Sequence, residues 1–306
     1  MATIGIIGSG NVGANTAFFV AERDVAHVCL YDVKDGLSTG KALDMMEDAP
    51  LREYRHRLRG TDDLNEVLDA EVIVVAAGEV RAPGERREDL YERNKPVVDE
   101  IAARLASWGG VTIVATEPVD PMTMRFVAAG LDRRRVIGIG GALDSARLRV
   151  LIARELGTPQ EDVKATVIGR HSDDMIALSA YCSVAGVPVT TLISAARLSE
   201  LISEAVETGD RIVNLAQRSS SYYGPAAVAT DIAEAVIRDT NRVLSVSLMF
   251  DGQYGITGVA MSLPALIGAK GVVRVLEPKL SDEEQARLSR SAASLKAYEQ
   301  AMRRSE

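Results

Sequence analysis

Cysteine, histidine and aromatic residues are scarce in this chain. Its 306 residues include two cysteines and three histidines, and aromatic residues make up 4% of the total. Two isolated cysteines, Cys29 and Cys182, cannot form a disulfide framework and do not have the spacing of a zinc site. The sequence therefore predicts neither a disulfide-rich fold nor a metal centre, and it favours a reducing, cytoplasmic location.

Long apolar runs and an excess of positive charge are also missing. No run approaches the ~18 apolar residues that would span a bilayer, and the first residues lead directly into a strand-like segment without the pattern of a signal peptide. The 35 Lys and Arg residues are outnumbered by 43 Asp and Glu residues, which gives a net charge of −8. We therefore expect no membrane partner and no nucleic-acid partner, since both would need a basic surface.

The first half of the chain alternates short apolar runs with longer helical patterns. The runs are almost continuous in Val, Ile, Ala and Leu, which is typical of strands buried on both faces of a parallel sheet. The alternation predicts an α/β fold with a doubly wound parallel sheet of the Rossmann type. Strands are expected at residues 3–7, 25–31, 72–76, 111–115 and 136–139, and helices at 11–23, 36–48, 90–107 and 121–129.

The second half has a different rhythm, and it predicts an α+β substrate domain. We place the boundary so that residues 1–141 form a dinucleotide-binding domain and residues 142–306 form the catalytic domain. Ser281 and Glu284 have the spacing of a capping box, which marks the start of the last helix. The expected helices are 144–156, 192–218, 226–240 and 281–304, and the expected strands are 163–168, 242–250 and 255–264.

A glycine-rich turn follows the first expected strand. Residues 8–13 fit the pattern G-x-G-x-x-G, in which Gly8 permits a tight turn, Gly10 lets a pyrophosphate approach the backbone and Gly13 lets the helix pack on the strand. The start of the helix then offers N–H groups to the phosphates. The residues expected to contact a dinucleotide here are Gly8, Gly10, Asn11, Val12 and Gly13.

An acidic residue completes this fingerprint. Asp32 ends the second expected strand, where a carboxylate can accept hydrogen bonds from the ribose hydroxyls of NAD and repel the 2′-phosphate of NADP. A solvated turn aspartate is the alternative, and Lys34 lies close enough to weaken the discrimination. We expect the cofactor to be NAD.

Two further segments carry residue types that suit acid–base chemistry on an anionic substrate. His171 follows an expected strand end, where functional residues collect, although a surface histidine is an equal alternative. Asp144 and Arg147 are three residues apart and share one face of a helix, either directed into a cleft or paired with each other. Residues 78–87 hold three arginines and follow a strand of the parallel sheet, so they form either a mobile lid or an ordinary solvated loop.

Taken together, these segments resemble the lactate/malate dehydrogenase family over essentially the whole chain. The resemblance implies an NAD-dependent 2-hydroxyacid dehydrogenase that interconverts malate and oxaloacetate in the cytoplasm, as part of the tricarboxylic acid cycle. It also implies a homodimer or a homotetramer. The matching segments are RAPGERR at 81–87, LDSAR at 143–147, GRHSD at 169–173 and DGQYG at 251–255.

The resemblance also implies roles for individual residues. His171 would be the general acid and base, and Asp144 would hold its imidazole in one orientation. Arg147 would bind the C1 carboxylate of the substrate in a bidentate fork, and Arg87 would polarise the C2 carbonyl.

The resemblance assigns the choice of substrate to Arg81. Lactate members of the family have glutamine at this position and malate members have arginine. The second carboxylate of a dicarboxylate needs a cation in a closed site, because an unpaired buried charge is costly. Ser221, near the start of a helix at Gly224–Ala226, would line the substrate pocket.

Two positions depart from the family pattern. Glu117 stands where the family has an asparagine that helps to hold the nicotinamide ribose, and an ionised carboxylate accepts hydrogen bonds but donates none. Ser172 stands where the family usually has glycine. Glu117 is retained as a candidate cofactor-binding residue.

Three alternatives to malate dehydrogenase activity remain at this point. The chain could be a lactate or other 2-hydroxyacid dehydrogenase, or a sensor that binds NAD(H) without turnover, since fold does not prove activity. An NAD-dependent, metal-assisted glycosidase would need a cysteine or histidine cluster in the cleft, and neither Cys29 nor Cys182 is near the candidate segments.

Overall fold

A computed structural model describes residues 2–82, 84–85, 87–216 and 221–304. The strands of the N-terminal half are β1 (Thr3–Ile7), β2 (His27–Tyr31), β3 (Leu58–Thr61), β4 (Val72–Val75), β5 (Val111–Val114) and β6 (Val136–Gly138). Its helices are α1 (Asn11–Glu22), α2 (Leu37–Glu47), α3 (Ala49–Arg52), α4 (Tyr91–Leu105) and α5 (Val119–Ala128), with short 3₁₀ turns η1 (Leu64–Val67) and η2 (Arg87–Leu90).

The six N-terminal strands form the expected doubly wound parallel sheet. Their spatial order is β3-β2-β1-β4-β5-β6, and every pair between neighbours is parallel. The order reverses direction between β1 and β4, and ligands of such sheets bind outside the carboxyl ends of the strands at that point. The Rossmann prediction is therefore confirmed.

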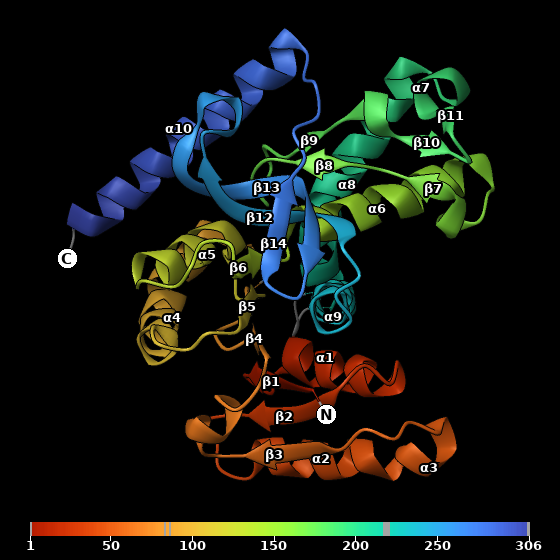
Figure 1. Cartoon of the computed structure of the whole chain (residues 1–306). Helices are drawn as coiled ribbons and strands as arrows, with labels where there is room; N and C mark the ends of the chain where they lie inside the picture. The colour runs from red at the N-terminus through yellow and green to blue at the C-terminus, as the bar shows by residue number, and fades with distance from the viewer. Residues whose placement is uncertain (1, 83, 86, 217–220, 305–306) are drawn as a thin grey trace.

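Both faces of this sheet are covered, as the continuous apolar runs predicted. Ile6 and Val74 face one core, which includes residues of α1 and α9 (Tyr223–Ile237), and Ile7 and Val75 face a second core that includes residues of α4 and α5. Successive residues of a strand point to opposite faces, so each strand must be apolar at every position. Figure 1 shows α4 and α5 on one side of β4 and β5, and α1 beside α9 on the other.

The C-terminal half extends the same sheet by antiparallel strands. β12 (Arg242–Asp251) pairs with β6 through Ser247 and Gly138, and the order continues to β13 (Thr257–Gly268) and β14 (Gly271–Val275). The remaining elements are α6 (Gly140–Leu156), η3 (Gln160–Asp162), β7 (Val163–Lys164), β8 (Val167–Ile168), β9 (Ile176–Ala177), η4 (Ser179–Tyr181), β10 (Ser183–Val184), β11 (Val187–Pro188), α7 (Val189–Leu192), α8 (Ala195–Ala216), η5 (Gln253–Gly255) and α10 (Asp282–Arg304).

Several expected elements differ from the observed ones. The single strand expected at 163–168 is wrong, because β7 and β8 are separate two-residue strands that belong to different small sheets. α6 begins at Gly140, four residues before the expected start. The strands β3, β9, β10, β11 and β14 and the short helices α3 and α7 were not expected from the sequence. Residues 217 and 218, expected to end a helix, lie outside the described residues.

The capping box at the start of α10 forms as expected. Glu284 accepts hydrogen bonds from the backbone N–H and the hydroxyl of Ser281, and its own N–H donates to that hydroxyl. α10 then packs against β13 and buries Leu288 and Leu295. Over the described residues, none of the helices combines the length and apolar character needed to cross a bilayer.

Candidate active site

The glycine-rich turn between β1 and α1 has the geometry that its sequence predicts. Gly8 has a φ of +98°, and a Cβ there would lie 2.5 Å from the backbone nitrogen of Ala77. A Cβ on Gly13 would lie 1.8 Å from the carbonyl oxygen of Gly8, so only glycine fits where the helix meets the turn. A Cβ on Gly10 would meet no atom within 4 Å, which leaves the backbone open on that side. This open backbone at a helix N-terminus fits a pyrophosphate group.

Asp32 is held beside this turn by hydrogen bonds. Its carboxylate accepts from the N–H and the hydroxyl of Ser9, at 2.7 and 2.8 Å, and from the N–H of Lys34 at 3.0 Å. Burial alone would raise the pKa of Asp32, but these hydrogen bonds outweigh it and leave the pKa below its ordinary value. Lys41 donates to the carbonyl of Ser9 at 2.5 Å and adds positive charge next to Asp32. Asp32 is therefore ionised and fixed at the end of β2.

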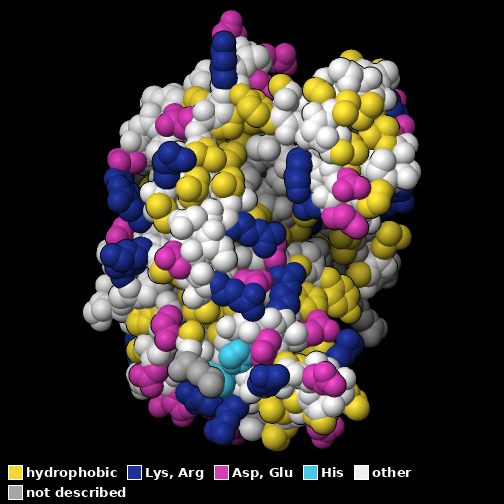
Figure 2. Space-filling model, turned by 45° about the vertical axis from the view of Figure 1, so that its right-hand side comes forward, with side chains coloured by type: hydrophobic (Ala, Val, Ile, Leu, Met, Phe, Trp, Pro, Cys, Tyr) yellow, Lys and Arg dark blue, Asp and Glu magenta, His cyan; other side chains and the backbone are white. Residues whose placement is uncertain are grey.

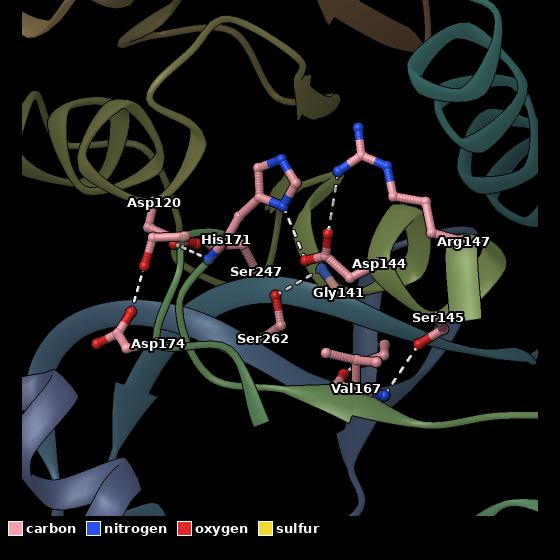
Figure 3. A network of polar contacts seen from close by, with 12 residues as sticks. Asp120, Gly141, Asp144, Ser145, Arg147, Val167, His171, Asp174, Ser247 and Ser262 are labelled. Carbon is pink, nitrogen blue, oxygen red and sulfur yellow. Dashed lines mark hydrogen bonds and ion pairs between the residues drawn. The ribbon is translucent and has the colours of Figure 1, made fainter. Parts of the chain in front are cut away.

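His171 and Asp144 form a buried pair (Figure 3). Nδ1 of His171 lies 2.8 Å from Oδ2 of Asp144, and the two side chains are 2% and 3% exposed. Arg147 approaches the other oxygen of Asp144 at 3.5 Å, so the expected shared face of α6 exists and the two charges contact each other. The Nε2 atom of His171 points away from Asp144. The arrangement can hold the imidazole in one orientation and stabilise its protonated form.

A second carboxylate fixes the backbone of His171. Asp120, in α5, accepts a hydrogen bond from the N–H of His171 at 2.7 Å and from the hydroxyl of Ser247, in β12, at 2.5 Å. Asp120 is fully buried, and this burial raises its pKa above the ordinary value in spite of the hydrogen bonds from Ser247 and His171. Asp120 therefore joins α5, the His171 loop and β12 at one point.

Ser262 of β13 fixes the segments on either side of the pair. Its backbone exchanges hydrogen bonds with Gly169, at 2.8 and 3.0 Å, and its hydroxyl accepts from the N–H of Gly141 at 2.8 Å. Gly141 lies in the first turn of α6, which carries Asp144, and Gly169 lies two residues before His171. One residue of β13 thus sets the distance between the helix of Asp144 and the loop of His171.

The carboxyl ends of β4 and β5 are tied together by Asn94 of α4. This fully buried side chain accepts from the N–H of Glu79 at 2.7 Å and donates to the carbonyl of Glu117 at 2.7 Å. The Glu117–Pro118 peptide bond is cis. The contacts hold the backbone of Glu117 at the carboxyl ends of these strands, and its side chain is half-buried.

A cavity of about 60 Å³ brings several of the expected residues together. It opens between the first helix turn, the ends of β4 and β5 and the His171 loop. Val12, Glu117, His171 and Ser221 all line it. Residues from both halves of the chain therefore share one cavity at the switch point of the sheet.

Arg81 lines a neighbouring cavity of about 340 Å³ instead. Its side chain is 7% exposed and pairs with Asp210 of α8 at 2.6 Å. Arg170 and Ser172, on either side of His171, line this larger cavity, so the two cavities adjoin. Among the described residues, Arg81 and His171 do not line the same cavity.

Parts of the arginine-rich segment lie outside the described residues. These are Pro83, Arg86 and the side chain of Arg87; Ser220, near the start of α9, also lies outside the described residues. The backbone of Arg87 begins η2, and Gly84 has a φ of +80°. The role expected for Arg87 therefore stays a prediction.

Several residues that position the site were missed by sequence reasoning, among them Asp120, Asn94, Lys41 and Asp210. Asp120, Asn94 and Lys41 act through contacts with distant segments, which local spacing does not reveal. Asp210 carries no signal in its own sequence context, because the middle of an amphipathic helix commonly holds acidic residues on its solvated face. A signal existed for Asp120, since it lies three residues after Glu117, which was a candidate cofactor-binding residue.

Family models match both halves of the chain. Residues 2–138 match the NAD binding domain of lactate/malate dehydrogenase, and residues 141–304 match the alpha/beta C-terminal domain of lactate/malate dehydrogenase. Among curated proteins, the chain is 39% identical to malate dehydrogenase from Desulforudis audaxviator, with 96% of each chain covered. It is 35% identical to malate dehydrogenase from Bacillus subtilis, again with 96% of each covered.

Solved structures resemble the fold closely. Malate dehydrogenase from Salinibacter ruber has a TM-score of 0.93 at 35% identity and covers 99% of this chain and 98% of its own. Lactate dehydrogenase from Cryptosporidium parvum, complexed with lactic acid and nicotinamide adenine dinucleotide, has a TM-score of 0.94 at 30% identity and covers 98% and 97%. The fold is thus similar to proteins of both substrate preferences, and the choice between the two acids depends on the site residues.

Proposed function

This chain belongs to the lactate/malate dehydrogenase family, and from that premise we propose that it is an NAD-dependent malate dehydrogenase. The reaction is the reversible transfer of hydride between (S)-malate and NAD⁺, which gives oxaloacetate and NADH. The observation that carries the proposal is the buried His171–Asp144 pair, 2.8 Å apart, beside a cavity that adjoins the glycine-rich turn.

His171 acts as the general base in the direction of malate oxidation. The Nδ1–H group of His171 donates a hydrogen bond to Asp144, so the unprotonated Nε2 atom accepts the proton of the substrate hydroxyl. Asp144 then stabilises the imidazolium that forms, as the acid of a catalytic triad does. Asp120 keeps the loop in place by holding the His171 N–H.

Arginines recognise the two carboxylates of the substrate. Arg147, beside Asp144 in α6, binds the C1 carboxylate, and Arg81 binds the distal carboxylate. Arg87 polarises the C2 carbonyl when the segment 78–87 closes over the substrate and excludes water. Ser221 lines the cavity next to His171, where a small side chain suits a compact dicarboxylate.

The cofactor residues are those of the glycine-rich turn together with Asp32 and Glu117. NAD, when bound, supplies the nicotinamide carbon that accepts the hydride. The open backbone at Gly10 and the ionised Asp32 fit the pyrophosphate and the adenosine ribose. Glu117 accepts a hydrogen bond from the ribose next to the nicotinamide, in place of an amide side chain.

Steady-state kinetics with oxaloacetate and pyruvate test the substrate assignment. With saturating NADH, we expect kcat/KM for oxaloacetate to exceed that for pyruvate at least about tenfold, because one charge-assisted contact discriminates by that much. A preference for pyruvate would overturn the malate assignment and favour a lactate-type enzyme.

Replacement of His171 tests the catalytic assignment. His171→Asn should lower kcat by about a hundredfold or more and leave NADH binding intact, as measured by fluorescence titration. His56→Asn is the matched control, because it removes a histidine that contacts Asp24 and His27 away from the cleft. Equal turnover by both variants would contradict the role of His171, and NADH binding without turnover by the wild type would identify a sensor.

We further propose a cytoplasmic homodimer or homotetramer that serves the tricarboxylic acid cycle, with neither a nucleic-acid nor a membrane partner. An apolar groove between α6, α8 and the start of α9 is bordered by the exposed Val150 and Tyr223 and is also lined by Arg147 and Ser221. It is the kind of surface that a subunit contact beside the substrate site covers. On the face drawn in Figure 2, Lys and Arg are interspersed with Asp and Glu. Light scattering of the purified chain measures the oligomeric state. The division of the chain into two domains, at residues 1–141 and 142–306, stays a prediction.

A further inference from the structure

The guanidinium that should recognise the substrate already has a carboxylate partner within the protein. Nη1 of Arg81 lies 2.6 Å from Oδ1 of Asp210, and it also donates to the carbonyl of Glu85 at 3.3 Å. Asp210 lies in α8, far along the chain from Arg81. The substrate's second carboxylate would need the same positive group.

The two side chains of the Arg81–Asp210 pair differ strongly in their exposure to solvent. The Arg81 side chain is 7% exposed, whereas that of Asp210 is 51% exposed. Both of these contacts are made by one nitrogen of Arg81, and its buried Nε has no hydrogen-bond partner among the described residues. The pair is thus not the bidentate fork that arginine forms with its tightest carboxylate partners. The half-exposed carboxylate of Asp210 can return to water when another anion takes its place.

The charged residues around Arg81 also oppose the binding of an anionic substrate. The cavity that Arg81 lines contains one other arginine among its described residues. Its described acidic residues are Glu85, Asp173, Asp174 and Asp210. Acidic groups outnumber basic groups around the site of an anionic substrate, and each nearby carboxylate disfavours the entry of a further negative charge. Removal of the carboxylate in direct contact with Arg81 should therefore have the largest effect.

We infer that Asp210 is a specificity-determining residue that competes with the substrate's distal carboxylate for Arg81. The inference rests on the proposed function, because it assumes that Arg81 receives that carboxylate. With Asp210 in place, a dicarboxylate must displace an internal anion before it binds, whereas a monocarboxylate does not. Asp210 thus weakens the binding of dicarboxylates and narrows the preference for them over monocarboxylates.

Replacement of Asp210 tests this competition. In Asp210→Asn and Asp210→Ala, we expect KM for oxaloacetate to fall about two- to fivefold, the range for an ion pair with one exposed partner. kcat should change less than KM, and KM for pyruvate should not fall. Both variants alter an exposed position on a helix, so the fold should tolerate them. Glu207→Gln is the control: it removes one charge from the same helix, one turn earlier, at a residue outside the described lining of this cavity.

Two outcomes would overturn the inference. An unchanged KM for oxaloacetate in both Asp210 variants would show that there is no competition. A raised KM would show that Asp210 orients Arg81 for the substrate.

Binding measured without turnover separates this inference from the proposed function. Calorimetric titration of the NADH-loaded protein with hydroxymalonate, a small dicarboxylate, should give a dissociation constant two- to fivefold lower for Asp210→Asn than for the wild type. Equal affinities would refute the role of Asp210 even if the wild type reduces oxaloacetate. A wild type that prefers pyruvate, yet shows the tighter binding in the variant, would refute the proposed function alone.

Discussion

Asp32 links cofactor recognition to the pH dependence of folding. Its carboxylate caps the turn between β1 and α1 through the N–H and hydroxyl of Ser9, and its pKa is lowered in the folded chain. Because the folded pKa lies below the unfolded value, the stabilisation is fully present above about pH 4, the ordinary range of an aspartate. It is lost as the pH falls through the folded pKa.

We therefore expect Asp32→Asn to lower the free energy of unfolding by about 1 kcal/mol at pH 7, a value reduced for the partial exposure of the site. Urea titrations at a series of pH values should show that the gap to the wild type closes as the pH falls below about 4. Asp35→Asn, at an exposed carboxylate three residues on, is the control. A gap of the same size at pH 7 and at the lowest pH would contradict the argument.

Residues whose function depends on near neighbours were predictable, and those that act across the chain were not. The spacing of Asp144 and Arg147 correctly indicated that they share one face of a helix. The contact between Asp120 and His171 spans 51 positions, and that between Asn94 and Glu117 spans 23. Such contacts arise only when the sheet brings strand ends together, so no local pattern encodes them.

At the scale of elements, the capping box of α10 makes a separable contribution to stability. Ser281→Ala removes a side chain that satisfies the N–H of Glu284, and the loss of such a cap costs about 1 kcal/mol. Urea denaturation should show this decrease with kcat unchanged, because no described residue of α10 lines the cavity of His171. Ser289→Ala, an exposed position inside the same helix, should leave stability equal or slightly higher, since alanine favours helix. If both variants lose stability equally, the cap is not responsible.

The interior strands were predictable from their sequences, and the edge strands were not. β4 and β5 are buried at every position, and their apolar runs, interrupted only by Thr112 of β5, indicated this. β3, at one edge of the sheet, has the sequence LRGT with only its first and last residues buried, and β14, at the other edge, has exposed positions as well. Edge strands need not be apolar on both faces, so they lack the signal.

α6 begins earlier than expected because its first turn starts with glycines that tertiary packing requires. Gly140 and Gly141 interrupt the helical pattern in the sequence, yet both are helical. A Cβ on Gly141 would lie 2.7 Å from the hydroxyl of Ser245 and 2.7 Å from the Cβ of Ser262. Glycine is needed there so that the helix can lie against β12 and β13, and this tertiary demand overrides helix propensity.

At the scale of the whole molecule, the two halves share one sheet and one core. β6 pairs with β12, and a single hydrophobic cluster contains Ile4 and Val28 from the N-terminal half together with Ile232 and Leu263 from the C-terminal half. The predicted division at residues 141 and 142 falls inside α6, next to this shared core. Structural continuity of this kind couples the unfolding of the two halves.

We accordingly expect a single calorimetric unfolding transition. NADH at about a hundred times its dissociation constant should stabilise the folded chain by about 2.7 kcal/mol and move the entire transition upward, because the ligand binds only the folded form. NADPH should have a smaller effect at the same concentration, since Asp32 disfavours a 2′-phosphate. Two transitions, of which NADH moves only the first, would contradict the coupling.

The junction between β6 and β12 also has a consequence for how the protein is made. During synthesis, β6 leaves the ribosome well before β12 is translated. The edge of the nascent nucleotide-binding sheet at β6 therefore stays unpaired until β12 is available. Exposed backbone at a strand edge readily recruits another polypeptide. Nascent chains whose translation stalls after Gly138 should therefore need a chaperone to prevent aggregation.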